Sequence, residues 1–252
     1  MGAALTPIKI ADEILRIVEA SAPGDPGVET RDRNDRLLVA AYGRAHRCFF
    51  SIRELVHRGE ADDAEILTRA LLSIALRSLY LAQPDDAEER QRRFRRAGRT
   101  YFEELLKAAR EEEAEGIDLA KDVKRLEENI ARFEAEGIAR LPTDHDLARS
   151  LDLAPFYTRV YRPGSDVAHY SIGAALDGFL ELTHEDLIGP VALLKPQPER
   201  AADVLIRAAL TYGMFLERAE PIVRHGVTES VRALLVDYFD QQQRSDADGG
   251  AT

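Results

Sequence analysis

Tryptophan is absent from this chain of 252 residues, and cysteine occurs once, as Cys48. A single cysteine excludes an intrachain disulfide framework and suits a reducing, cytoplasmic compartment. Cys48 precedes Phe49 and Phe50, and a thiol in such an apolar run is usually buried and inert rather than nucleophilic. No apolar run approaches the roughly 18 residues that a membrane-spanning helix needs. No signal peptide precedes the first predicted helix, so we expect a cytoplasmic protein without a membrane partner.

The sequence also lacks the common motifs of catalytic and metal sites. It has no Gly-rich phosphate loop, no Cys-x-x-Cys, no His-Glu-x-x-His and no Gly-x-Ser-x-Gly. Six histidines are scattered along the chain, and no two stand at the i, i+4 spacing of zinc-binding helices. We therefore expect neither a metal nor a cofactor. His46 lies beside the apolar stripe of its helix, as a boundary histidine satisfied by a neighbouring side chain does.

Basic residues are fewer than acidic residues in this chain. Lys and Arg number 34 against 45 Asp and Glu, so the net charge is −11 and nucleic acid could bind only at a local basic patch. One candidate patch contains six arginines within ten residues: Arg90, Arg92, Arg93, Arg95, Arg96 and Arg99. Either these arginines bind phosphate groups, or they form a solvated face with crossed salt bridges to Glu134 and Glu136. The second reading is favoured, and each such bridge stabilises little.

Helical periodicity runs through almost the whole chain, and strand-like alternation is almost missing. We therefore predict an all-α, multi-helix bundle with helices at about 7–21, 34–58, 61–82, 165–182, 198–219 and 228–243. The helix at 61–82 is apolar nearly all round in its middle, so Leu71 and Ile74 are expected in the core. Short helices are expected between Pro142, Pro155 and Pro163, one of them capped by Thr143.

Residues 85–137 differ from the rest because their charges are dense and their apolar residues form a narrow seam. Leu119, Val123, Leu126, Ile130 and Phe133 follow one another at spacings of 4, 3, 4 and 3. This coiled-coil spacing, with Gly116 between two helices, predicts an antiparallel helical hairpin inserted into the bundle. We expect one domain over residues 1–244 and a disordered polar tail over 245–252.

The segment Tyr161-Arg162-Pro163-Gly164-Ser165-Asp166-Val167-Ala168-His169 carries the main candidate for chemistry. If Ser165 caps a helix, His169 lies in the second turn and Asp166 shares its face. An imidazole that shuttles protons and a guanidinium that grips a phosphate suit phosphodiester cleavage, which makes Arg162, His169 and Asp166 candidate catalytic residues. The alternative is structural: Arg162 ties a loop to carboxylates, and His169 is satisfied at a helix start. On spacing alone the structural alternative is favoured.

Two segments resemble DUF5677, a bacterial family of unknown function. The first begins Leu67-Thr68-Arg69-Ala70-Leu71-Leu72, and the second is Tyr157-Thr158-Arg159-Val160-Tyr161-Arg162 followed by Ser165 and His169. With Leu141-Pro142 and Leu147-Ala148 between them, the resemblance spans about residues 35–182. The Arg162…His169 pair is in turn similar to the Arg-x(4–6)-His signature of HEPN helical domains. That similarity implies a metal-independent endoribonuclease of a toxin or defence system, with RNA as substrate and a homodimer as the active form.

Two functions therefore remain open. One is a non-catalytic helical bundle that binds a partner or ligand, in which Arg162 and His169 hold the fold. The other is a HEPN-like endoribonuclease that uses Arg162, Asp166 and His169. The first is favoured because fold-level similarity does not establish a reaction. Whether the protein is an enzyme is not decided by the sequence.

Overall fold

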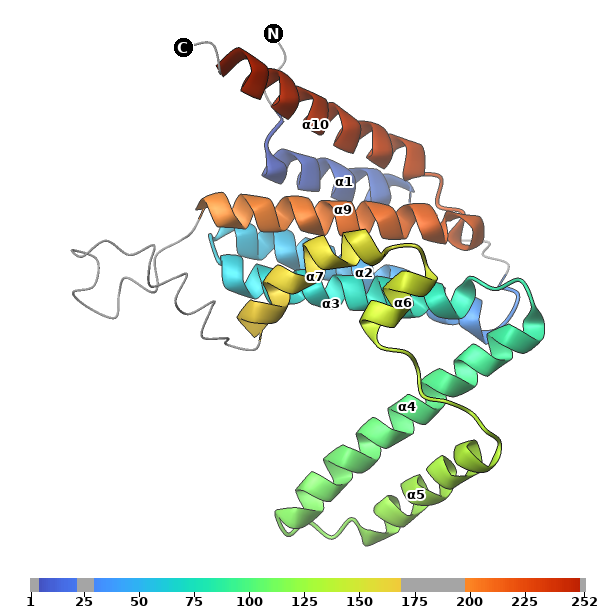
Figure 1. Cartoon of the computed structure of the whole chain (residues 1–252). Coiled ribbons are helices and arrows are strands. Elements are labelled where there is room, and N and C mark those ends of the chain that lie inside the picture. Colours follow the sequence, from blue (N-terminus) through green and yellow to red (C-terminus); the bar gives the residue numbers. More distant parts are fainter. Residues whose placement is uncertain (1–4, 22–29, 169–197, 250–252) are drawn as a thin grey trace, which may run out of the picture.

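The computed structural model describes the backbone of residues 5–21, 30–168 and 198–249, and the side chains in these ranges apart from 162–168, 199 and 245–249. These residues form helices and contain no strand (Figure 1). The helices are α1 (Pro7–Ser21), α2 (Arg33–His57), α3 (Ala61–Ala82), α4 (Ala87–Ala114), α5 (Ala120–Ala135), α6 (Asp144–Ser150), α7 (Ala154–Ala168), α9 (Pro198–Val223) and α10 (Thr228–Gly249). The predicted all-α class is confirmed.

Helix α3 is the centre of the bundle. It packs against α2, α7 and α9, while α1 and α10 lie on the side of α9 away from α3 (Figure 1). Leu71, Leu72 and Leu76 on α3 are completely buried, whereas Ile74 is only partly buried. The apolar run in the middle of this helix thus predicted its burial, because a helix that is apolar on every side can be stable only inside a core.

Helices α4 and α5 form a pair that projects from the bundle (Figure 1). They run antiparallel, since Arg110 contacts Glu127 at 2.7 Å and Arg99 contacts Glu134 at 3.0 Å. Gly116 adopts a left-handed φ of 97° at the turn between them. The pair has little core of its own: Leu126 is the one buried residue of α5. The single domain proposed for residues 1–244 stays a prediction.

Two predicted helix starts can be compared with the structure. Thr143 caps α6 as predicted, because its Oγ1 accepts a hydrogen bond from the Asp146 amide at 3.3 Å. Ser165 was expected to cap a new helix, and this is wrong, since α7 continues through Pro163 to Ala168. Proline at this position costs one hydrogen bond to the Arg159 carbonyl, and Arg159 is exposed, so water can replace the missing donor. The remainder of the helix predicted at 165–182 lies outside the described residues.

The helical backbone of α10 continues to Gly249, past Ser245, where the sequence favours a disordered tail. Helix α9 likewise runs to Val223 rather than ending near residue 219, with Pro221 inside its last turn. This end of α9 lies close to the ends of α2 and α3, and the candidate site is found there.

Candidate functional site

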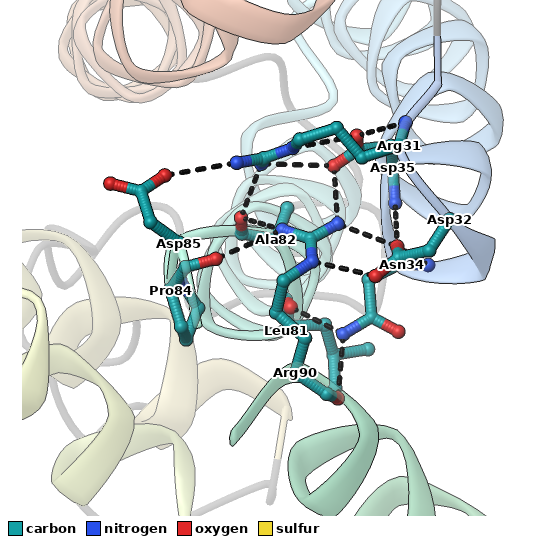
Figure 2. A network of polar contacts seen from close by, with 9 residues as sticks. All are labelled: Arg31, Asp32, Asn34, Asp35, Leu81, Ala82, Pro84, Asp85 and Arg90. Atoms are coloured by element: carbon teal, nitrogen blue, oxygen red, sulfur yellow. Dashed lines mark hydrogen bonds and ion pairs between the residues drawn. The ribbon is translucent and has the colours of Figure 1, made fainter. Parts of the chain in front are cut away.

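A buried arginine joins the ends of three helices. Arg90 lies in the first turn of α4, and its side chain is only 2% exposed (Figure 2). Its Nη2 contacts Asp32 Oδ1 at 2.5 Å and Asp35 Oδ1 at 2.7 Å, at the start of α2. Its Nη1 donates to the Ala82 carbonyl at 2.6 Å and to the Pro84 carbonyl at 3.1 Å, at the end of α3. One side chain therefore neutralises two acids and satisfies two carbonyl groups.

Local sequence explains why the acids stand at the start of α2. Asp32 is the N-cap, and its carboxylate accepts hydrogen bonds from the Asn34 and Asp35 amides. Asp35 lies in the first turn, where the helix dipole favours a negative charge. Asn34 then donates to the carbonyls of Leu81 and Arg90, so the same turn also binds the backbone of α3 and α4.

A second arginine completes the network. Arg31 donates from Nε to Asp35 Oδ2 at 3.0 Å and from Nη2 to the Ala82 carbonyl at 3.1 Å. Its Nη1 reaches Asp85 at 3.0 Å (Figure 2). In contrast to Arg90, the Arg31 side chain is 44% exposed. Arg31 therefore forms the boundary between the buried network and solvent.

The electrostatics of the network are those of a structural site. Hydrogen bonds from Arg90 lower the pKa of Asp32 to about 2. Burial of Asp35 opposes its ionisation, but hydrogen bonds from Arg31 and Arg90 outweigh that cost and lower its pKa. Both acids are therefore ionised and fully engaged at neutral pH, so neither can serve as a general base.

A cleft of about 550 Å³ lies beside this network. Its lining has an apolar part, here called the floor, from α2, α3, α9 and the segment after α6, and a charged part, here called the margin. The floor includes Leu38, Leu79, Leu151, Leu153 and Ile222. The charged margin comprises Arg31, Asp35, Asp85, Glu217, Arg218 and Arg224. A volume of this size and an apolar lining with a few polar groups are typical of small-molecule sites.

The two arginines that α9 contributes to the margin are exposed. The side chains of Arg218 and Arg224 have no hydrogen-bond or ion-pair partner among the described residues, although the Arg224 amide donates to the Glu220 carbonyl at 2.9 Å. Arg224 follows the end of α9 with a left-handed φ of 52°. That conformation costs a residue with a Cβ about 1–2 kcal/mol.

A second polar cluster brings the two family-like segments together. The Arg69 guanidinium lies 4.4 Å from the centre of the Tyr161 ring, which stacks on Tyr157 at 4.5 Å. Nearby, Asp144 accepts hydrogen bonds from Ser73 at 2.5 Å and Arg77 at 3.0 Å. These contacts connect α3 with α6 and α7. Their role is to hold α7 against the core helix.

The proposed catalytic residues are only partly placed. Arg162 and Asp166 lie one turn apart on α7, but their side chains are not among those described. His169 lies outside the described residues. The pairing of Arg162 with His169 therefore stays a prediction.

Other sequence candidates have structural roles. His46 is a boundary histidine as predicted, with Nδ1 3.1 Å from the Tyr212 hydroxyl and Nε2 3.6 Å from Glu19. Burial raises the pKa of the Cys48 thiol to about 11, so it is not a thiolate nucleophile at neutral pH.

The arginines of α4 follow the salt-bridge interpretation, with one exception. Arg95 pairs with Glu136 and Arg99 with Glu134, as the antiparallel register predicts. Arg90 was expected on a solvated face, and this is wrong because it is buried in the network described above. Sequence analysis also missed Arg31, Arg218 and Arg224. The only local signal was the acidic helix start at Asp32, which predicts a cap but not its distant partner.

No described helix is long and apolar enough to cross a membrane. Among the same residues, no three histidine, cysteine or acidic side chains are placed to hold a metal ion.

Comparison with known proteins gives a family but no characterised relative. The match to DUF5677, a family of unknown function, covers residues 35–187. It begins at Asp35 and includes most of α2, all of α3 to α7 and the cluster around Tyr161. Arg31, Asp32 and Asn34 of the Arg90 network and the whole of α9 lie outside it. No curated protein and no solved structure matches the chain. Because the family match covers more than half of the sequence, this chain belongs to DUF5677.

Proposed function

We propose that this protein is a non-catalytic, ligand-binding helical bundle and that the cleft beside Arg31 is its binding site. The observation that carries the proposal is a cleft with an apolar floor next to a polar network whose charged groups are paired. Leu38 belongs to α2 and Leu79 to α3, and both are buried. Hydrogen bonds from Arg90 join the start of α2 to the end of α3, which fixes the positions of these two leucines. A pre-formed apolar cavity with few polar groups binds ligands without much reorganisation.

The composition of the cleft favours binding over catalysis. The described residues that line it include no histidine, cysteine, lysine, serine, threonine or tyrosine. Its carboxylates are engaged: Asp35 by two arginines, Asp85 by Arg31 and Glu217 by Arg232. A site for general acid–base chemistry needs a group that can change protonation near neutral pH, and these residues do not supply one.

A neutral fluorescent probe tests the proposal. N-phenyl-1-naphthylamine should bind saturably with one site per chain, and its emission should rise as it enters the cleft. Gln83→Trp places a bulky ring at the exposed end of α3, on the cleft margin, and should abolish most of this signal. Gln91→Trp, at an exposed position of α4, is the matched control and should bind like the wild type. Equal binding by the Gln83 variant would show that the cleft is not the site.

The alternative function is a HEPN-like, metal-independent endoribonuclease. It is supported by the Arg162…His169 pattern in the family-matching region, with Arg162 and Asp166 one turn apart on a continuous helix. A substrate 2′-hydroxyl would attack the adjacent phosphorus, with His169 as acid or base and Arg162 on the phosphate oxygens. His169→Ala and Arg162→Lys should then abolish cleavage of a labelled RNA without changing the melting temperature. A wild type that cleaves no RNA would leave only the binding function.

A further inference from the structure

We infer that the ligand of this cleft is an amphipathic anion, with an apolar body on the leucine floor and an oxyanion headgroup held by Arg218 and Arg224. This inference rests on the proposed function, because it takes the cleft to be a binding site. It adds the chemical class of the ligand.

Charge pairing around the cleft is the first argument. The margin carries three arginines and three acids, so its formal charges cancel and the count alone favours neither a cationic nor an anionic ligand. However, Asp35 is buried against Arg31 and Arg90, Asp85 pairs with Arg31, and Glu217 pairs with Arg232. Arg218 and Arg224 remain as the cations without a partner among the described residues of the margin. These two guanidinium groups are therefore available to an anionic group of a ligand, although the protein as a whole is negative.

The arrangement of α9 is the second argument. Arg218, Pro221 and Ile222 are spaced three and four residues apart, so they share one face of the helix that borders the cleft. Arg224 follows directly after the helix ends. A cationic group and an apolar surface thus lie side by side, which matches a ligand with an anionic head and an apolar body. Guanidinium groups bind carboxylate and phosphate through paired hydrogen bonds.

The backbone of Arg224 is the third argument. Its φ of 52° lies in the left-handed region, where glycine is the usual residue after a helix. An arginine here costs folding free energy that glycine would avoid, and no contact of the Arg224 side chain with the described residues offsets that cost. The arginine does not stabilise the fold at this position, and contact with a ligand would give its side chain a function.

Two dyes with one scaffold test the inference. 1-Anilinonaphthalene-8-sulfonate differs from N-phenyl-1-naphthylamine by its sulfonate group alone. The wild type should bind the sulfonate at least about tenfold more tightly, since a charge-assisted contact is worth about that factor. Arg218→Gln and Arg224→Gly should each remove about tenfold of the sulfonate affinity and leave the neutral dye within twofold. Arg58→Gln makes the same charge change at the exposed far end of α2 and should alter neither dye.

Competition then separates the sources of the headgroup. Decanoate, decyl phosphate and decanol are titrated against the bound sulfonate dye. Displacement by either anion at a concentration at which decanol fails supports the inference and shows which oxyanion is preferred. Displacement by decanol as effective as that by both anions overturns it.

Failure of the inference can be told apart from failure of the proposed function. If Gln83→Trp blocks both dyes but the arginine variants bind both normally, the cleft binds ligands without selecting anions, and the inference is overturned. If Gln83→Trp blocks neither dye, the proposed function fails as well. Arg224→Gly should melt at or above the wild-type temperature, so its loss of sulfonate binding cannot be assigned to unfolding.

Discussion

At the scale of single residues, Arg90 is a buried cation with many polar partners. Removing a guanidinium from water costs several kcal/mol, which only close partners can offset. Arg90 has two carboxylates and two carbonyls within 3.1 Å. Its partners belong to the ends of α2 and α3, so its contribution is to fix where three helix ends meet.

Arg90→Met should lower the free energy of unfolding by about 3–5 kcal/mol, because it leaves the buried carboxylate of Asp35 without one of its two cations. Urea denaturation measures the change. Arg92→Met, at a position where the side chain is 49% exposed, is the matched control and should shift stability by less than about 0.5 kcal/mol. Similar losses in the two variants would contradict the structural role of the network.

Leu71→Ala should cost about 2–5 kcal/mol, since the side chain is completely buried in the core helix. Leu105→Ala removes the same atoms from an exposed position of α4 and should cost far less. Ile74 was grouped with Leu71 in the sequence, but its partial exposure predicts a smaller loss for Ile74→Ala. A change below about 1 kcal/mol for Leu71→Ala would show that it is not core.

At the scale of elements, the α4–α5 pair is held together differently from the bundle. Its seam contains the Phe102 and Phe133 rings, whose centres are 6.0 Å apart, and its faces carry exposed ion pairs. Exposed ion pairs add only about 0.2–1 kcal/mol each. We therefore expect the tip of this pair to open more readily than any helix of the core.

Limited digestion with a protease that cleaves after glutamate should cut first near Gly116. Glu112, Glu113 and Glu115 are exposed beside this turn, whereas Glu65 is buried on α3 and paired with Arg207. Fragments of the digest identified by mass spectrometry give the order of cleavage. An early cut at Glu65, with the turn intact, would mean that the pair is the more protected element.

At the scale of the whole molecule, two histidines lie between helices: His225 is buried and His46 is half-buried. Desolvation lowers the pKa of His225, although Glu220 lies 2.6 Å from its Nδ1 and opposes the change. Its Nε2 donates to the Leu216 carbonyl at 3.0 Å, and its ring stacks on Tyr42 of α2 at 5.4 Å. Desolvation also lowers the pKa of His46. These rings connect α2 with the middle of α9 and with its C-terminal end.

Stability should therefore fall as the pH drops from about 7.5 to 5.5. The unfolded chain takes up protons on its histidines near pH 6.5, whereas the folded state resists protonation of His225, so acid favours unfolding. The effect of the acids with lowered pKa, Asp32 and Asp35, is confined to pH values below about 4.

The measurement is the pH dependence of the free energy of unfolding in the wild type and in His225→Gln. The difference between their slopes isolates His225, because all other titrating groups are common to both. The variant should show a weaker decline toward acid. His57→Gln, at an exposed position, should keep the wild-type slope. A variant with a steeper decline would reverse the assigned direction of the His225 pKa.

The sequence by itself determined the helices and the core, because both depend on local patterns. The span 61–82 was predicted to the residue, and its apolar run predicted the burial of Leu71. The crossed pairs of Arg95 and Arg99 with Glu136 and Glu134 followed from the antiparallel register alone. In each case the interacting residues belong to one helix or to two helices joined by a short turn, so their spacing in the chain specifies their spacing in space.

Only the tertiary structure decided the network and the cleft. Arg90 belongs to the same run as Arg95 and Arg99, yet it is buried because its partners stand more than fifty residues earlier, at Asp32 and Asp35. The cleft forms where the ends of α2, α3 and α9 meet, and no segment alone contains it. Residue type states which groups can carry charge, but burial and pairing depend on contacts between distant parts of the chain.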